Sequence, residues 1–141
     1  EFNSPETDSK VDRAYTEDDF KNVGYYNRAF KAYFVDSSGN KGYKTVSVYV
    51  YNPDNKTAPT LTASETPITI VLNSDVNTIT WVGEGCPITS AVDADGLDVS
   101  SKVSADLSTL DSSTPGTYDV RITVTDFVGN AAETTVQVVV E

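Results

Sequence analysis

The sequence predicts an all-β protein whose main part is a β-sandwich, and three observations lead to this prediction. Apolar and polar residues alternate in many short segments, which is the period of a half-buried strand. Gly, Asn, Asp and Pro separate these segments, as turn residues do. A hairpin-like stretch occurs twice, so the chain contains an internal repeat about as long as a small domain.

The clearest segment is residues 116–140, which predicts two strands joined by a tight turn. Val120, Ile122 and Val124 alternate with polar residues. Residues 126–130 interrupt the pattern with Gly and Asn, which tolerate the positive φ angles of hairpin turns. The alternation then resumes at Val136, Val138 and Val140.

The same pattern is found earlier in the chain. Residues 36–40 match residues 126–130, and a second run of valines follows them at the same offset of 90: Val46, Val48 and Val50. Towards the N-terminus the offset becomes 92, because residues 24–26 align with residues 116–118. The first copy therefore has two extra residues between Tyr26 and Asp36.

The second copy, residues 57–141, is expected to be a complete sandwich. Short strands separated by turn signals are predicted at residues 60–63, 67–72, 78–82, 88–92, 102–106, 117–125 and 132–140. Trp81 is expected to lie on a strand and to anchor the core. Tyr118 follows a turn into a long strand, where its position is like that of a tyrosine corner, whose hydroxyl bonds back to nearby backbone.

Residues 1–56 are predicted to form only half of such a domain. The expected elements are a disordered start over 1–9, strands over 10–15, 25–35 and 43–51, and a turn or one Thr16-capped helical turn over 17–20. Residues 52–59 contain two prolines and are interpreted as a short, semi-rigid linker between the two domains.

These motifs resemble the bacterial immunoglobulin-like domains of surface proteins, of the kind called bacterial Ig-like, group 3. The shared features are Gly-x-Tyr, alternating Val and Thr, Asp-x-x-Gly-Asn and a closing Val-rich strand. Residues 91–98 are similar to that family's Ala-x-Asp-x-Asp-Gly-Asp segment, with Leu97 inserted before the last Asp. The resemblance covers residues 58–141 as a whole copy and about residues 8–51 as half of one.

The resemblance implies an immunoglobulin-like β-sandwich in tandem with a truncated first copy. It also implies a non-catalytic extracellular module, acting as a spacer or adhesion unit of a bacterial cell-surface or secreted protein, with neighbouring domains in a larger chain. Two alternatives stay open. One is a carbohydrate- or protein-binding module that uses the Tyr-rich N-terminal half. The other is an ancillary domain of a secreted enzyme or of a phage virion protein.

Charge and composition exclude several function classes. The net charge is −11 and is unevenly distributed. Residues 1–56 carry 9 acidic and 8 basic residues, whereas residues 57–141 carry 12 acidic and 2 basic residues. This balance argues against nucleic acid as a partner, because phosphate binding needs a basic patch. The sequence has no apolar run near the ~18 residues of a membrane span, so we expect no membrane insertion.

Catalysis is not expected, because the residues that usually carry it are missing. The chain has no histidine, and Cys86 is its single cysteine. One thiol forms no internal disulfide and offers no zinc motif. Without a histidine the thiol also lacks the usual base that activates a nucleophile. We therefore predict no enzyme and no cofactor other than calcium.

Calcium is considered because acidic residues cluster in two predicted loops. Asp93, Asp95 and Asp98 lie in one loop and Asp126 lies in another. Carboxylate and carbonyl oxygens are the ligands that calcium takes. The loop is not an EF-hand, because Gly96 stands fourth rather than sixth. The alternative is a solvated Asp/Gly turn with no ion.

Eleven of the 14 aromatic residues precede residue 57. Tyr25, Tyr33, Tyr43 and Tyr49 are the candidate ligand-binding residues, as a stacking platform for a glycan or a docking face for a protein. The alternative is that these side chains simply suit a pleated, half-buried sheet.

A half sandwich should also expose the inner face of its sheet. That face would carry side chains drawn from Phe30, Phe34, Val46, Val48 and Val50. Such a patch should not remain in water, and the strand edges beside it would be open to pairing. We therefore expect residues 1–56 to be completed by a strand of a partner polypeptide or to self-associate.

Overall fold

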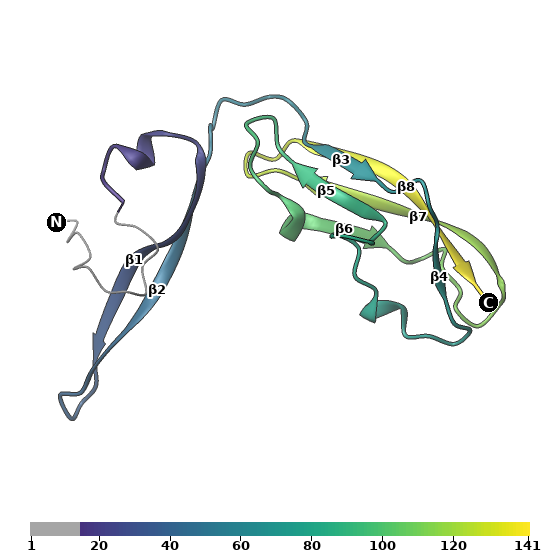
Figure 1. Ribbon diagram of the computed structural model, residues 1–141, viewed down its shortest axis with the longest axis horizontal. Coiled ribbons are helices and arrows are strands. Elements are labelled where there is room, and N and C mark those ends of the chain that lie inside the picture. The colour runs from purple at the N-terminus through teal and green to yellow at the C-terminus, as the bar shows by residue number, and fades with distance from the viewer. Residues whose placement is uncertain (1–14) are drawn as a thin grey trace. The chain divides into compact units, whose positions relative to one another are not determined.

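The computed structural model describes residues 15–141 and confirms the all-β prediction (Figure 1). The chain divides into two compact units between Asn52 and Pro53, four residues before the boundary expected from the sequence. The expected disorder over residues 1–9 lies outside the described residues. So does the expected strand over residues 10–15, except for Tyr15, which is not in a strand.

The first unit contains a hairpin. A short 3-10 helix, η1 (Asp19–Lys21), precedes β1 (Gly24–Val35) and β2 (Lys41–Val50), which pair antiparallel. Both strands were predicted to within two residues at each end. A 3-10 helix, η1, forms near the expected helical turn, but its N-cap residue is Asp18 rather than Thr16. Thr16 instead donates its backbone N–H and its hydroxyl to the carboxylate of Asp19, the first residue of η1.

A bulge interrupts the first unit's hairpin between Tyr26 and Phe30. Arg28 has a φ of 52° there, which is rare for a residue with a side chain. Its backbone N–H donates to the Ser47 hydroxyl oxygen at 2.9 Å, and that hydroxyl lies 3.1 Å from Asn27 Oδ1. The bulge thus holds the two extra residues that the sequence offsets require.

The second unit contains two sheets. β3 (Thr60–Ala63) pairs antiparallel with β5 (Ile88–Val92). The other sheet has the strand order β4-β8-β7-β6. Its strands are β4 (Ile68–Ile70), β6 (Val103–Asp106), β7 (Gly116–Thr125) and β8 (Ala131–Val140). β4 runs parallel to β8, whereas the β6–β7 and β7–β8 pairs are antiparallel.

The core of the second unit lies between these two sheets, as in a β-sandwich (Figure 1). Ile88 of β5 is fully buried against alternate residues of β7 and β8, and Leu61 of β3 packs on the same cluster. The inward residues of the larger sheet are Val120, Ile122, Val136, Val138 and Val140. Every second residue from Val120 to Val124 and from Val136 to Val140 is therefore buried, which is the pattern read from the sequence.

The strand predicted over residues 78–82 is wrong. Asp75 accepts a hydrogen bond from the Asn77 N–H and starts a 3-10 helix, η2 (Val76–Thr78), which takes up the first residue of the predicted segment. Ile79 is already extended, but residues 79–81 lie in no strand. Only Val82 forms a single bridge, to Ile88. Trp81 does not lie on a strand, and its half-buried side chain packs against the margin of the core. The third 3-10 helix, η3 (Ser100–Lys102), leads into β6.

The two hairpins share their register. Phe30 faces Val46 as Val120 faces Val136, and Phe34 faces Gly42 as Val124 faces Ala132. Before the bulge, Tyr26 faces Val48 as Tyr118 faces Val138. These pairs keep the offsets of 90 and 92 found in the sequence, so each residue outside the bulge has a defined counterpart in the other hairpin.

Candidate functional site

The four predicted tyrosines lie on one face of the β1–β2 hairpin. Tyr25 is directly opposite Tyr49, and Tyr33 is opposite Tyr43, and side chains of directly opposed residues share a face. The ring centroids of these pairs are 4.7 and 6.1 Å apart. The Lys31 ammonium lies 4.8 Å from the centroid of the Tyr43 ring. We call this face, with these five residues, the tyrosine face.

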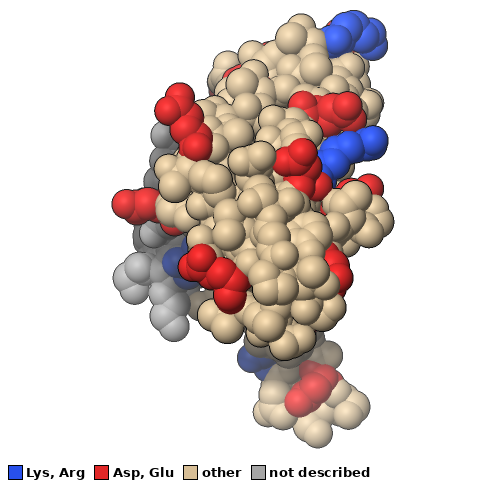
Figure 2. All heavy atoms as spheres, turned by 90° about the vertical axis from the view of Figure 1, so that its right-hand side faces the viewer, with Lys and Arg blue, Asp and Glu red and all other residues tan. Residues whose placement is uncertain are grey.

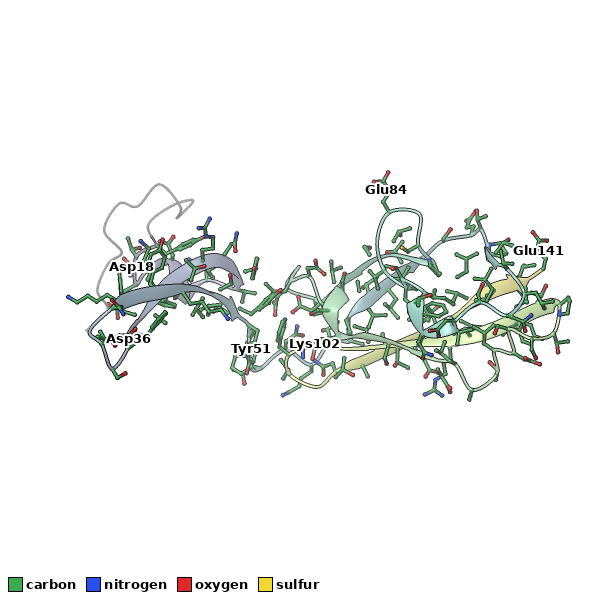
Figure 3. All side chains as sticks on the ribbon, turned by 90° about the horizontal axis from the view of Figure 1, so that it is seen from below. Asp18, Asp36, Tyr51, Glu84, Lys102 and Glu141 are labelled. Atoms are coloured by element: carbon green, nitrogen blue, oxygen red, sulfur yellow. The ribbon has the colours of Figure 1, made fainter. Side chains whose placement is uncertain are left out.

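The tyrosine face is exposed in the first unit. The exposed fractions are 50% for Tyr25, 69% for Tyr33, 41% for Tyr43 and 39% for Tyr49. Figure 3 shows side chains projecting from both faces of the hairpin, with Tyr51 labelled just after β2. The structure thus places all four residues that the sequence proposed as ligand-binding on one face, as two facing pairs six residues apart along β2.

The counterpart of the tyrosine face in the second unit is mostly polar. The equivalent residues on β7 and β8 are Thr117, Thr123, Glu133 and Val139. Strand propensity alone therefore does not require tyrosine at these positions. Phenol rings offer a flat apolar surface with a polar tip, which can stack on sugar rings or on protein side chains.

Two buried acidic residues of the second unit, Asp93 and Asp126, lie in turns that have the same hydrogen-bond pattern. Asp126 accepts hydrogen bonds through Oδ1 from the N–H groups of residues 128, 129 and 130 at 2.7–2.9 Å. Asp93 accepts in the same way from Asp95 and Leu97 at 2.9 and 2.8 Å. Each turn has Gly in third place after the Asp, with a positive φ that suits Gly alone.

The hairpin of the first unit has this turn as well. Asp36 Oδ1 accepts from the N–H groups of Ser38 and Asn40 at 2.9 Å, and Asn40 Nδ2 donates to Asp36 Oδ2 at 2.7 Å. The Asn130 side chain binds Asp126 Oδ2 at the same distance. The Asp-x-x-Gly turn therefore occurs three times, of which the sequence repeat revealed two.

Hydrogen bonding lowers the pKa of the carboxyl group in two of these turns, those of Asp126 and Asp36. Burial alone would raise the pKa of the Asp126 carboxyl, which is only 3% exposed, but the hydrogen bonds from Asn130, Val128 and Gly129 outweigh it and lower the pKa. Hydrogen bonds from Asn40 lower the pKa of Asp36 in the same way. The carboxylates act as anionic acceptors that close the turns.

Asn55 joins two of these turns, and sequence reasoning missed it. Its Nδ2 donates to Asp95 Oδ2 at 3.1 Å, and its carbonyl oxygen accepts from Asn130 Nδ2 at 3.1 Å. Its Oδ1 accepts from the Thr57 N–H at 2.9 Å. Asn55 lies in the segment interpreted as a linker, where an Asn next to Pro and Asp signals only a turn.

The four residues predicted for calcium are arranged differently from one another. Asp93 and Asp126 are buried, and their Oδ1 atoms hold turn amides. Asp95 is exposed and bonded to Asn55. Asp98 is exposed, and hydrogen bonds from Ser100 lower its pKa.

Residues 15–141 contain no group of three or more Asp, Glu, His or Cys side chains placed to hold a metal ion. Calcium binding stays a prediction, and melting in millimolar calcium and in chelator tests it. An ion that binds only the folded chain raises the Tm by mass action. Identical melting curves in calcium and in chelator would contradict calcium binding.

Acidic side chains are spread over the second unit rather than gathered at one point. Figure 2 shows several of them on the face turned to the viewer, among few basic ones. Lys102 is exposed, and its ammonium lies 4.7 Å from the centroid of the Phe127 ring. In the part of the chain that the structure describes, no helix is long and apolar enough to cross a membrane. A search of protein-family models and of curated proteins finds no match to this chain.

Proposed function

We propose that this chain is a non-catalytic extracellular module that acts as a spacer or adhesion unit of a bacterial cell-surface or secreted protein. The observation that carries the proposal is the pairing of β4 with β8. Ile68, Thr69 and Ile70 pair in parallel with the last three residues of β8. Two further bonds extend the ladder, from Leu72 N–H to the Glu141 carbonyl at 2.9 Å and from Glu141 N–H to the Ile70 carbonyl at 3.1 Å.

This ladder gives the second unit resistance to tension. Because β4 and β8 are parallel, a pull on the two ends of the unit drives the strands past each other in opposite directions. All hydrogen bonds of the ladder are then loaded together, whereas an antiparallel pair pulled at one end opens bond by bond. Asn55 adds to this by holding the start of the unit to two turns. A spacer that transmits force needs these properties.

Forced unfolding of single molecules tests the proposal. Leu72→Pro removes the N–H that donates to the Glu141 carbonyl at the end of this ladder, and Ser104→Pro makes the same kind of change in β6, the opposite edge strand of the sheet. Both side chains are exposed. We expect Leu72→Pro to lower the unfolding force clearly more than Ser104→Pro, at comparable losses in Tm. Equal losses of force from the two substitutions would contradict the spacer role.

The tyrosine face supports a second candidate, a binding module for a carbohydrate or a protein. Its rings are exposed at positions where the equivalent strands of the second unit have mostly polar residues. A glycan array with the intact chain tests the carbohydrate form of this proposal. Binding should be lost in the double variant Tyr33→Ala/Tyr43→Ala and kept in the matched variant Thr123→Ala/Glu133→Ala of the second unit. Loss in both variants, or in neither, would contradict binding through the tyrosine face.

A further inference from the structure

The strands of the first unit's hairpin are basic, although the chain as a whole is acidic. β1 and β2 contain no acidic residue and four basic ones: Arg28, Lys31, Lys41 and Lys44. The equivalent strands β7 and β8 contain one basic and two acidic residues. Because the whole chain has a net charge of −11, the positive strands of this hairpin differ in charge from the rest of the protein.

Two of these lysines lie beside a tyrosine pair. Lys31 is two residues before Tyr33 on β1, and Lys41 is two residues before Tyr43 on β2. Residues two apart on a strand share a face, so Lys41 is on the same side of the hairpin as the tyrosine face. The strands are antiparallel. The Tyr33–Tyr43 pair therefore has Lys31 on the side away from the turn and Lys41 on the side next to it.

The second unit has a carboxylate where this face has a ring. Arg121 is the equivalent of Lys31, and its Nε lies 3.4 Å from Oε2 of Glu133. Glu133 is the equivalent of Tyr43, whose ring centroid lies 4.8 Å from the Lys31 ammonium. A cation–π contact keeps the ammonium charged and close to the ring. A ligand that stacks on Tyr43 therefore also meets a positive charge.

The spacing of the tyrosine pairs suits an elongated ligand. Tyr49 follows Tyr43 by six residues on β2, which is roughly 20 Å along a strand. Each of the two has a tyrosine opposite it on β1. One small molecule does not span two such platforms, whereas a linear chain of repeating units does.

We propose that the tyrosine face binds an acidic polysaccharide, a linear chain of sugar rings that bear carboxylates. The proposal rests on the binding-module candidate above and names its ligand class. The apolar faces of the sugars stack on the tyrosine pairs. A carboxylate attached at the edge of a stacked sugar is directed along the sheet, where Lys31 and Lys41 flank the Tyr33–Tyr43 pair and bind it.

The acidic character of the chain does not oppose this binding strongly. Exposed charges further apart than the Debye length, about 8 Å at physiological ionic strength, are largely screened from each other. A bound carboxylate therefore responds to the lysines beside it more than to the net charge of the chain.

Two probes with one backbone separate charge from stacking. They are an oligogalacturonate and its methyl ester, which keeps the sugar rings and removes the negative charges. We expect the oligogalacturonate to cause saturable amide shifts at Tyr33, Lys41 and Tyr43 in NMR spectra of the intact labelled chain. It should bind tighter than the ester by on the order of tenfold, the combined effect of two exposed charge pairs. Added salt should reduce this difference.

Two lysine variants test the position of the charge. Lys41→Gln and Lys44→Gln remove the same charge from opposite faces of β2, because Lys41 is opposite Val35 and Lys44 is opposite Ala32. Both lysines are exposed, and unshifted amides of the second unit check that the variants are folded. We expect Lys41→Gln to weaken oligogalacturonate binding about two- to fivefold and Lys44→Gln to leave it unchanged.

The contrary results distinguish this proposal from the binding module on which it rests. Equal affinity for the oligogalacturonate and its ester, or equal losses from the two lysine variants, would overturn the acidic ligand class and leave a glycan-binding face. The absence of saturable shifts with either probe at millimolar concentration would overturn carbohydrate binding itself. Tighter binding of polyglutamate or of single-stranded oligothymidylate would replace the polysaccharide with an acidic protein segment or a nucleic acid.

Discussion

The β1–β2 and β7–β8 hairpins have the same register and the same turn but different surroundings. In the second unit Val136, Val138 and Val140 are buried beneath β3 and β5. In the first unit the equivalent Val46 is 42% exposed, and Val48 and Val50 are half-buried. Local sequence therefore sets the hairpin, whereas burial depends on what covers it. The following predictions test how far that separation holds.

The largest difference between the two hairpins should be in the unfolding free energy lost when an inner-face side chain is truncated. Ile122 is fully buried in the core, so Ile122→Ala should cost about 2–5 kcal/mol of unfolding free energy through lost burial and a cavity. Val46→Ala removes an exposed side chain in the other hairpin and should cost well under about 1 kcal/mol. Chemical denaturation of both variants measures this. A large loss from Val46→Ala would mean that Val46 is covered in solution, by a partner or a second copy.

The Asp-x-x-Gly turn that both hairpins share should contribute more to stability in the second unit than in the first. Asp126 is buried and holds three backbone N–H groups, so Asp126→Ala leaves them without their acceptor and should cost about 2–4 kcal/mol. Asp36 makes similar bonds in water, where solvent replaces them, and its removal should cost much less. Comparing the two alanine variants by thermal melting decides the point, and equal effects would show that burial is irrelevant to this turn.

Acid should weaken the second unit more than the first unit's hairpin. In the described hairpin, hydrogen bonds lower the pKa of one carboxyl, that of Asp36, below the ordinary value of 3.8. In the second unit they lower the pKa of five carboxyls, those of Asp75, Asp98, Asp106, Asp111 and Asp126. A carboxyl with a lowered folded-state pKa adds stability that is full above its unfolded pKa. That stability disappears as the pH falls through the folded pKa.

We therefore expect amide protection in β7 and β8 to fall steeply from pH 5 to below pH 3.8, measured by hydrogen exchange corrected for intrinsic rates. Asp126→Asn cannot titrate and should show a shallower fall. If amide protection falls equally steeply in the wild type and in Asp126→Asn, then titration of Asp126 does not contribute to the loss of stability in acid.

The sequence predicted the strands with strict alternation and the repeat, because period two and Asp-x-x-Gly turns are local signals. It failed over residues 78–82, where the 3-10 helix takes up only residue 78 and residues 79–81 lie in no strand although Ile79 is extended. β propensity does not report whether an extended segment finds a partner strand. It singled out Tyr25, Tyr33, Tyr43 and Tyr49 from composition, and the pairing across the hairpin shows that they share one face; their role in binding stays a prediction. It missed Asn55, whose partners lie 40 and 75 residues away, and such contacts depend on tertiary packing alone.

The smallest expected difference concerns the two tyrosine corners. The Tyr118 hydroxyl donates to the Thr114 carbonyl at 2.9 Å, as the sequence predicted, and the Tyr26 hydroxyl lies 2.8 Å from the Asn22 carbonyl. Tyr26 also bonds the Asp19 carbonyl and packs its ring against Phe20.

Tyr118→Phe should cost about 0.5–1.5 kcal/mol, the net value of one hydrogen bond. Tyr26→Phe should cost more, because Tyr26 is buried whereas Tyr118 is only half-buried, so water replaces the lost hydroxyl donor less readily there. Hydrogen exchange in β1–β2 and in β7–β8 reports each hairpin separately. Here the first unit should be the more sensitive one, the reverse of the earlier predictions. If Tyr118→Phe proves the more damaging, the aromatic cluster around Tyr26 does not hold the first unit together.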